Sequence, residues 1–118
     1  MKTNTVLLLA GAAIAIFLLR GRAAASGIAL LTPANRAVLP MGFSQFRWQG
    51  RPLLPGEGWI FQVAYDSQFR NIYFNTTNTF AGQNVTWGKP EPAIFWRVGI
   101  VAGGATTWSE VRSLRVQG

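Results

Sequence analysis

The chain has 118 residues, of which 49% are hydrophobic and 13% charged, and its eleven Lys and Arg exceed its four Asp and Glu. This length permits one small domain. Because the sequence contains neither Cys nor His, it offers no thiolate nucleophile, no imidazole proton shuttle and no conventional zinc site. The few carboxylates are scattered along the sequence, so we expect no enzyme activity, no cofactor and no metal.

The most apolar stretch runs from Val6 to Leu19 and contains no polar side chain. As a helix, the seventeen residues from Thr3 to Leu19 would be about 25 Å long, at the short end for crossing a bilayer. Two arginines follow the run, where their charges can reach the headgroups. We therefore predict a single-pass transmembrane anchor within residues 1–22. Its expected residues are Val6, Leu7, Leu8, Leu9, Ile14, Ile16, Phe17, Leu18, Leu19, Arg20 and Arg22.

A cleaved signal peptide is the alternative interpretation of the same segment. Ala23-Ala24-Ala25 before Ser26 would serve as a cleavage site. Arginines between the apolar run and these alanines favour a retained anchor instead. The positive-inside rule does not determine the orientation, because the basic charges on the two sides of the run nearly balance.

After a short linker at residues 23–27, short apolar runs alternate with Pro, Gly and Asn at intervals of roughly ten residues, which is typical of an all-β domain. We expect one β-sandwich domain over residues 28–118. Its seven strands are expected at residues 28–31, 43–48, 59–65, 70–74, 83–87, 94–101 and 108–116.

Period-two alternation predicts which side chains enter the core. The expected core consists of Phe46, Trp48, Trp59, Phe61, Val63, Tyr65, Ile94, Trp96, Val98, Ile100 and Leu114. The last strand breaks the alternation, because Arg112 shares a face with Leu114. We expect a β-bulge near Val111 that turns Val111 inward and leaves Arg112 and Arg115 in solvent.

Several motifs occur in a recognisable order: Phe46-Arg47-Trp48, Phe61-Gln62-Val63-Ala64, Phe95-Trp96-Arg97-Val98 and Trp108-Ser109-Glu110-Val111-Arg112. Over residues 28–117 the chain resembles a fibronectin type III domain of the bacterial or phage type. The resemblance implies a seven-strand Greek-key sandwich that serves as a scaffold for display, spacing or binding, and it carries no catalytic residues.

The loop at residues 50–58 is the best candidate for binding a partner, because Leu53 and Leu54 lie between two prolines and Arg51 is beside them. The two leucines would otherwise form a lid over the end of the core, and the sequence leaves both interpretations open. Asp66 is expected to cap the turn that follows it rather than to bind a metal or a sugar.

Nucleic acid is disfavoured as a partner, because residues 28–118 carry eight basic side chains against four acidic ones, a modest formal net charge of +4. A small-molecule substrate is disfavoured too. We expect a membrane-anchored structural or binding module whose partners are the lipid bilayer and protein neighbours in a larger assembly. That assembly would be a membrane-containing virion or a bacterial envelope complex. The alternative is an exported adhesion or carbohydrate-binding module released after Ala25.

Overall fold

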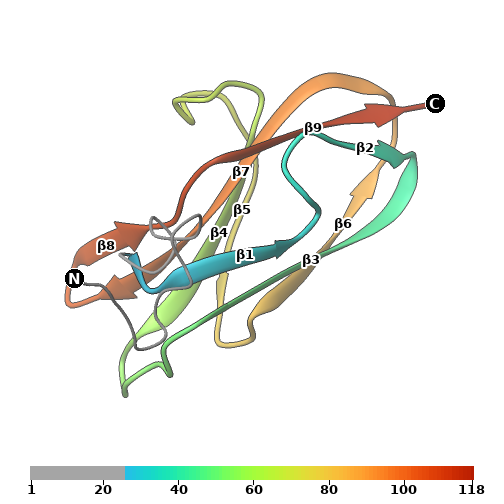
Figure 1. The fold of residues 1–118 in the computed structure, drawn as a ribbon. Helices are drawn as coiled ribbons and strands as arrows, with labels where there is room; N and C mark the ends of the chain where they lie inside the picture. Colours follow the sequence, from blue (N-terminus) through green and yellow to red (C-terminus); the bar gives the residue numbers. More distant parts are fainter. Residues whose placement is uncertain (1–25) are drawn as a thin grey trace, which may run out of the picture.

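The computed structural model describes residues 26–118, which form two β-sheets packed face to face as a sandwich (Figure 1). The smaller sheet has the strand order β1 (Ile28–Thr32), β3 (Gly42–Gly50) and β6 (Gly82–Trp87). The larger sheet has the order β2 (Ala37–Pro40), β9 (Arg112–Gln117), β7 (Glu91–Ala102), β4 (Gly58–Ala64) and β5 (Ile72–Asn78), with β8 (Ala105–Trp108) paired to β7. The architecture is compatible with an immunoglobulin-like or fibronectin type III-like domain.

The core lies between the two sheets and follows the predicted alternation. Phe46 and Trp48 point inward from β3, and they meet residues of β4 and β7 from the opposite sheet. The buried aliphatic and aromatic side chains include Trp59, Phe61, Val63, Ile94, Trp96, Val98, Ile100 and Leu114. The predicted core is thus confirmed, except that Tyr65 is only half-buried at its margin.

The first two strands, β1 and β2, belong to different sheets. β1 pairs antiparallel with β3, whereas β2 pairs in parallel with β9. The chain crosses between Thr32 and Ala37, and Arg36 adopts a φ of 66° at this crossing. There the backbone N–H of Arg36 donates to the carbonyl of Ser113 at 2.7 Å. The short segment between Thr32 and Ala37 therefore links β1, an edge strand of the smaller sheet, to β2, an edge strand of the larger sheet.

Nine strands are present among residues 26–118, where the sequence predicts seven. One addition is β2. The other arises because the expected strand at residues 108–116 is interrupted: Trp108, the last residue of β8, pairs with Gly99 of β7, and pairing with β7 resumes at Arg112, opposite Trp96. Ser109 fills the gap by donating its backbone N–H to the Val98 carbonyl at 2.7 Å.

The orientation predicted for Val111 and Arg112 is wrong, although one extra residue relative to β7 does lie before Arg112. Val111 is 41% exposed, and Ser109 is the residue buried in this segment. Arg112 is half-buried and donates to the carbonyl of Pro33 at 2.8 Å, whereas Arg115 is exposed as expected. Hydrogen bonding to the crossing segment, rather than burial of a valine, determines the path of the chain here.

Candidate functional site

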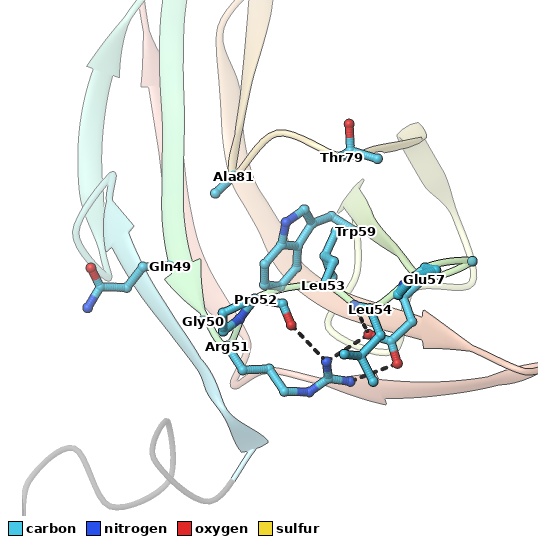
Figure 2. Close-up of a pocket in the computed structure, with 12 residues that line it drawn as sticks. Gln49, Gly50, Arg51, Pro52, Leu53, Leu54, Glu57, Trp59, Thr79 and Ala81 are labelled. Atoms are coloured by element: carbon cyan, nitrogen blue, oxygen red, sulfur yellow. Dashed lines mark hydrogen bonds and ion pairs between the residues drawn. The ribbon is translucent and has the colours of Figure 1, made fainter.

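The predicted partner-binding loop connects β3 to β4 and is closed by one carboxylate. Arg51 donates to Glu57 through two nitrogens, at 2.7 and 3.1 Å, and the backbone N–H of Leu54 donates to the same carboxylate at 2.8 Å (Figure 2). The Glu57 amide returns a hydrogen bond to the Leu54 carbonyl at 3.0 Å. Gly56 lies in the turn with a φ of 86°, a conformation that favours glycine.

These contacts make Glu57 an anchor for the loop. Its side chain is 11% exposed against 45% for Arg51. The hydrogen bond from Arg51, followed by that from the Leu54 amide, lowers the pKa of Glu57 below its ordinary value of 4.5. The carboxylate therefore stays ionised near neutral pH and holds the loop in one conformation.

The two adjacent leucines of the loop differ in burial, and neither interpretation that the sequence left open applies to both of them. Leu53 is half-buried and packs against the core, and in Figure 2 it lies beneath the indole of Trp59. Leu54 is 61% exposed. Leu53 is thus part of the lid, and Leu54 is the side chain available to a partner.

The loop borders a hollow of about 660 Å³ at one end of the sandwich. Its lining comes from the end of β3, the loop, the start of β4 and the turn between β5 and β6 (Figure 2). The lining residues are Gln49, Gly50, Arg51, Pro52, Leu53, Leu54, Pro55, Gly56, Glu57, Trp59, Thr79 and Ala81. Phe80, in the same turn, is 78% exposed. Phe80 was not among the predicted site residues, although an aromatic residue between Thr79 and Ala81, in a stretch of small and polar residues, was a signal for an exposed turn.

On the outer face of the larger sheet, Arg97 is held between two aromatic rings. Its guanidinium carbon lies 3.7 Å from the ring centroid of Trp108 and 4.2 Å from that of Phe69. Its Nε donates to Gln62 at 3.0 Å. Burial under the rings lowers the pKa of Arg97 below that of an ordinary arginine. The two rings therefore cover the Arg97 guanidinium, which is packed against the sheet surface instead of extending into solvent.

Asp66 caps the turn after β4, as the sequence predicts. Its carboxylate accepts the backbone N–H of Asn71 at 2.9 Å and that of Arg70 at 3.1 Å. These amides lower the pKa of Asp66. The turn also places Phe69 with a φ of 57°, which directs its ring over Arg97. Among residues 26–118, no group of three or more metal-ligating side chains is found.

The surface charge of the described domain is positive. Six of its basic side chains are exposed: Arg36, Arg47, Arg51, Arg70, Lys89 and Arg115. All four acidic side chains are buried or half-buried: Glu57, Asp66, Glu91 and Glu110. Arg36 and Arg115 also line a second hollow of about 420 Å³ beside Val38 and Phe95.

The predicted anchor residues, from Val6 to Arg22, lie outside the described residues. Within residues 26–118, no helix is long and apolar enough to cross a membrane. Comparison of the chain with family models, with curated proteins and with solved structures found no match.

Proposed function

We propose that the chain is a non-enzymatic, membrane-anchored structural or binding module. In this proposal, residues 1–22 hold the protein in the bilayer and the sandwich contacts protein neighbours in a larger assembly. The setting that fits is a membrane-containing virion or a bacterial envelope complex. We further propose that the sandwich is of the bacterial or phage fibronectin type III kind, on the strength of the sequence motifs and of the two-sheet architecture.

The observation that carries the proposal is the uninterrupted apolar run from Val6 to Leu19, followed at once by Arg20 and Arg22. The run contains Leu, Ile, Phe and Val residues, each of which favours insertion by about 0.3–0.6 kcal/mol at the centre of a span. Alanine and glycine, which contribute little, make up the whole remainder of the run. The anchor is therefore marginal, and contacts of the sandwich with its neighbours would help to retain the protein.

The described domain supports a contacting role for two reasons. Its exposed charges are basic, which suits acidic protein surfaces and anionic headgroups. Its exposed apolar side chains include Leu54, on a loop that the Arg51–Glu57 pair fixes in place. A loop whose backbone is already fixed loses little entropy on binding.

Membrane fractionation of the full-length chain tests the proposal. The unmodified protein should remain with membranes after a carbonate wash and enter the detergent phase. Ile14→Asp should release it, because an unpaired charge is then buried in hydrocarbon. Phe43→Asp, which places the same charge on an exposed sandwich residue, is the control and should stay with the membrane. Full-length protein that is soluble without detergent would refute the anchor.

The exported module remains the second candidate, because Ala23-Ala24-Ala25 precedes Ser26. The two candidates differ in the mature amino terminus. Intact-mass measurement of the protein from its native source should give a chain that retains residues 1–22. A mature chain beginning at Ser26 would support the exported adhesion or carbohydrate-binding module instead.

A further inference from the structure

The described part of the chain begins at one end of the sandwich. β1 starts at Ile28, which pairs with Gly50 at the end of β3. The loop at residues 50–58 and the turn at residues 79–81 both line the hollow at this end. Gly58 pairs with Val101, so the β7–β8 turn lies here too (Figure 1). We call these three connections, at residues 50–58, 79–81 and 102–105, the N-terminal pole.

The N-terminal pole exposes apolar side chains at the tips of its connections, and its carboxylate is paired with a basic residue. Leu54 and Phe80 are 61% and 78% exposed and belong to two different connections. The β7–β8 turn, Ala102-Gly103-Gly104-Ala105, contributes only small side chains. The acidic Glu57 is neutralised by Arg51, and Asp66, at the far end of β4, is not part of the pole.

Basic charge near these apolar tips comes from Arg47, which is exposed on the outer face of β3, where it pairs with Gly82 next to the 79–81 turn. Arg51 is exposed as well, but Glu57 offsets its charge. Apolar tips beside a basic side chain suit the headgroup layer of an anionic membrane. A protein partner could also bind exposed leucine and phenylalanine. The distance of the N-terminal pole from the bilayer distinguishes a lipid partner from a protein partner.

The length of the linker limits how far the N-terminal pole can lie from the bilayer. Residues 23–27 connect the predicted anchor to the pole, and five residues span at most about 18 Å in any conformation. The sandwich is longer than this, since the twelve residues of β7 extend over about 36 Å. A bilayer reached through this linker therefore lies close to the N-terminal pole and far from the opposite end, where the C-terminus lies (Figure 1).

We infer that the N-terminal pole lies against the bilayer, with Leu54 and Phe80 inserted at the level of the headgroups and Arg47 facing anionic lipid. This inference rests on the proposed anchor and names the partner of the exposed loop: a lipid surface rather than a protein. It gives the domain a fixed orientation and directs the Arg36–Arg115 hollow toward the rest of the assembly.

The lack of native cysteine allows each position to be tested with a single label. The variants Leu54→Cys and Phe80→Cys of the full-length chain are labelled with an environment-sensitive fluorophore and reconstituted into vesicles of phosphatidylcholine and phosphatidylglycerol. Phe43→Cys is the matched control, because Phe43 is 60% exposed but lies about 23 Å farther along β3 from Gly50. Quenching by a headgroup-level nitroxide lipid is compared with quenching by aqueous iodide.

The labels at positions 54 and 80 should shift to the blue on reconstitution and show severalfold higher lipid quenching, relative to iodide, than the label at position 43. Equal quenching at all three positions in vesicle-bound protein would overturn the inference but leave the anchor intact. A label at position 54 shielded from both quenchers would indicate a protein contact, such as a second copy, and would also overturn it. Full-length protein that does not float with the vesicles would refute the proposed anchor, and the inference with it.

Discussion

The indole of Trp48 lies parallel to the ring of Phe61, with ring centroids 5.6 Å apart and 9° between the planes, so that this pair joins β3 of one sheet to β4 of the other. Phe46 contacts Trp96 edge to face at 4.9 Å and extends the aromatic layer to β7. Stacked and edge-to-face pairs add about 0.5–1.5 kcal/mol each beyond the area they bury. Aromatic packing is therefore the main link between the sheets.

Three of the four buried tryptophans, Trp48, Trp87 and Trp96, differ in hydrogen bonding, and we predict that they differ in their response to substitution by phenylalanine. Trp87 donates to the Ser44 hydroxyl at 3.2 Å, whereas the buried indole nitrogens of Trp48 and Trp96 have no hydrogen-bond partner among residues 26–118. Trp87→Phe should therefore cost about 1 kcal/mol more than Trp96→Phe, because it leaves a buried hydroxyl unsatisfied. Chemical denaturation measures both changes.

Ser44→Ala provides the control for this comparison. In the Ser44→Ala background, Trp87→Phe should become as mild as Trp96→Phe, since no hydroxyl is then left unsatisfied. Truncation of Trp96 to Ala should cost about 3–5 kcal/mol, because it opens a cavity in the centre of the core. An unchanged denaturation midpoint for Trp96→Ala would contradict the strand register described above.

The second prediction concerns Arg97, whose flat guanidinium fits between Phe69 and Trp108. Arg97→Lys keeps the charge but removes the planar stack and the hydrogen bond to Gln62. We expect it to destabilise the domain by about 1 kcal/mol and to increase the mobility of the Trp108 side chain, measured by NMR relaxation of its indole N–H. Arg70→Lys, at an exposed basic residue nearby in the sequence, should change neither quantity.

The alternation of the sequence was sufficient to predict the part of the core that β3, β4 and β7 supply, because most inward positions of these strands carry a large apolar residue. Ser44, which is buried in β3, is a polar exception. It could not predict the interruption after Trp108, since that depends on Ser109 bonding to Val98 and Arg112 bonding to Pro33, two contacts between distant parts of the chain. The short β2 was missed for the same reason. Its four residues become a strand only because β9 pairs with them.

The candidate loop was only partly predictable. Its boundaries followed from Gly and Pro, but Leu53 and Leu54 are adjacent and equally apolar, so composition did not tell which one is buried. The Arg51–Glu57 pair decides this by fixing the backbone of Leu54. Phe80 could not be assigned to the same end of the domain without the pairing of β5 with β4 and of β6 with β3.

The third prediction separates the two leucines. Leu53→Ser should lower the free energy of unfolding by about 2 kcal/mol, because a side chain packed on the core is replaced by a polar one. Leu54→Ser should leave it within about 0.5 kcal/mol of the unmodified protein, as is usual for exposed positions. Thermal and urea unfolding measure both. Equal losses for the two variants would mean that Leu54 is also part of the lid.

The last prediction is the pH dependence of the loop at residues 50–58. The pKa of Glu57 is lower in the folded protein than its ordinary value of 4.5, chiefly because of Arg51. A carboxylate of this kind binds fewer protons in the folded state than in the unfolded state, so its stabilising effect is complete above the unfolded pKa. The effect is then lost as the pH falls through the lower folded value. Amide hydrogen exchange at Leu54 should therefore be slow near neutral pH and should lose its protection under acid conditions, below the ordinary pKa of a glutamate.

Two variants identify the group responsible. In Glu57→Gln, protection of the Leu54 amide should already be reduced near neutral pH and should change little with acid, because no carboxylate is left to titrate. Asp66 also has a lowered pKa, from the amides of Asn71 and Arg70, and it contributes to acid sensitivity in the turn after β4. Asp66→Asn should therefore weaken that turn and leave the pH profile of Leu54 unchanged. If Leu54 lost its protection at the same pH in Glu57→Gln as in the unmodified protein, the Arg51–Glu57 pair would not be what holds the loop.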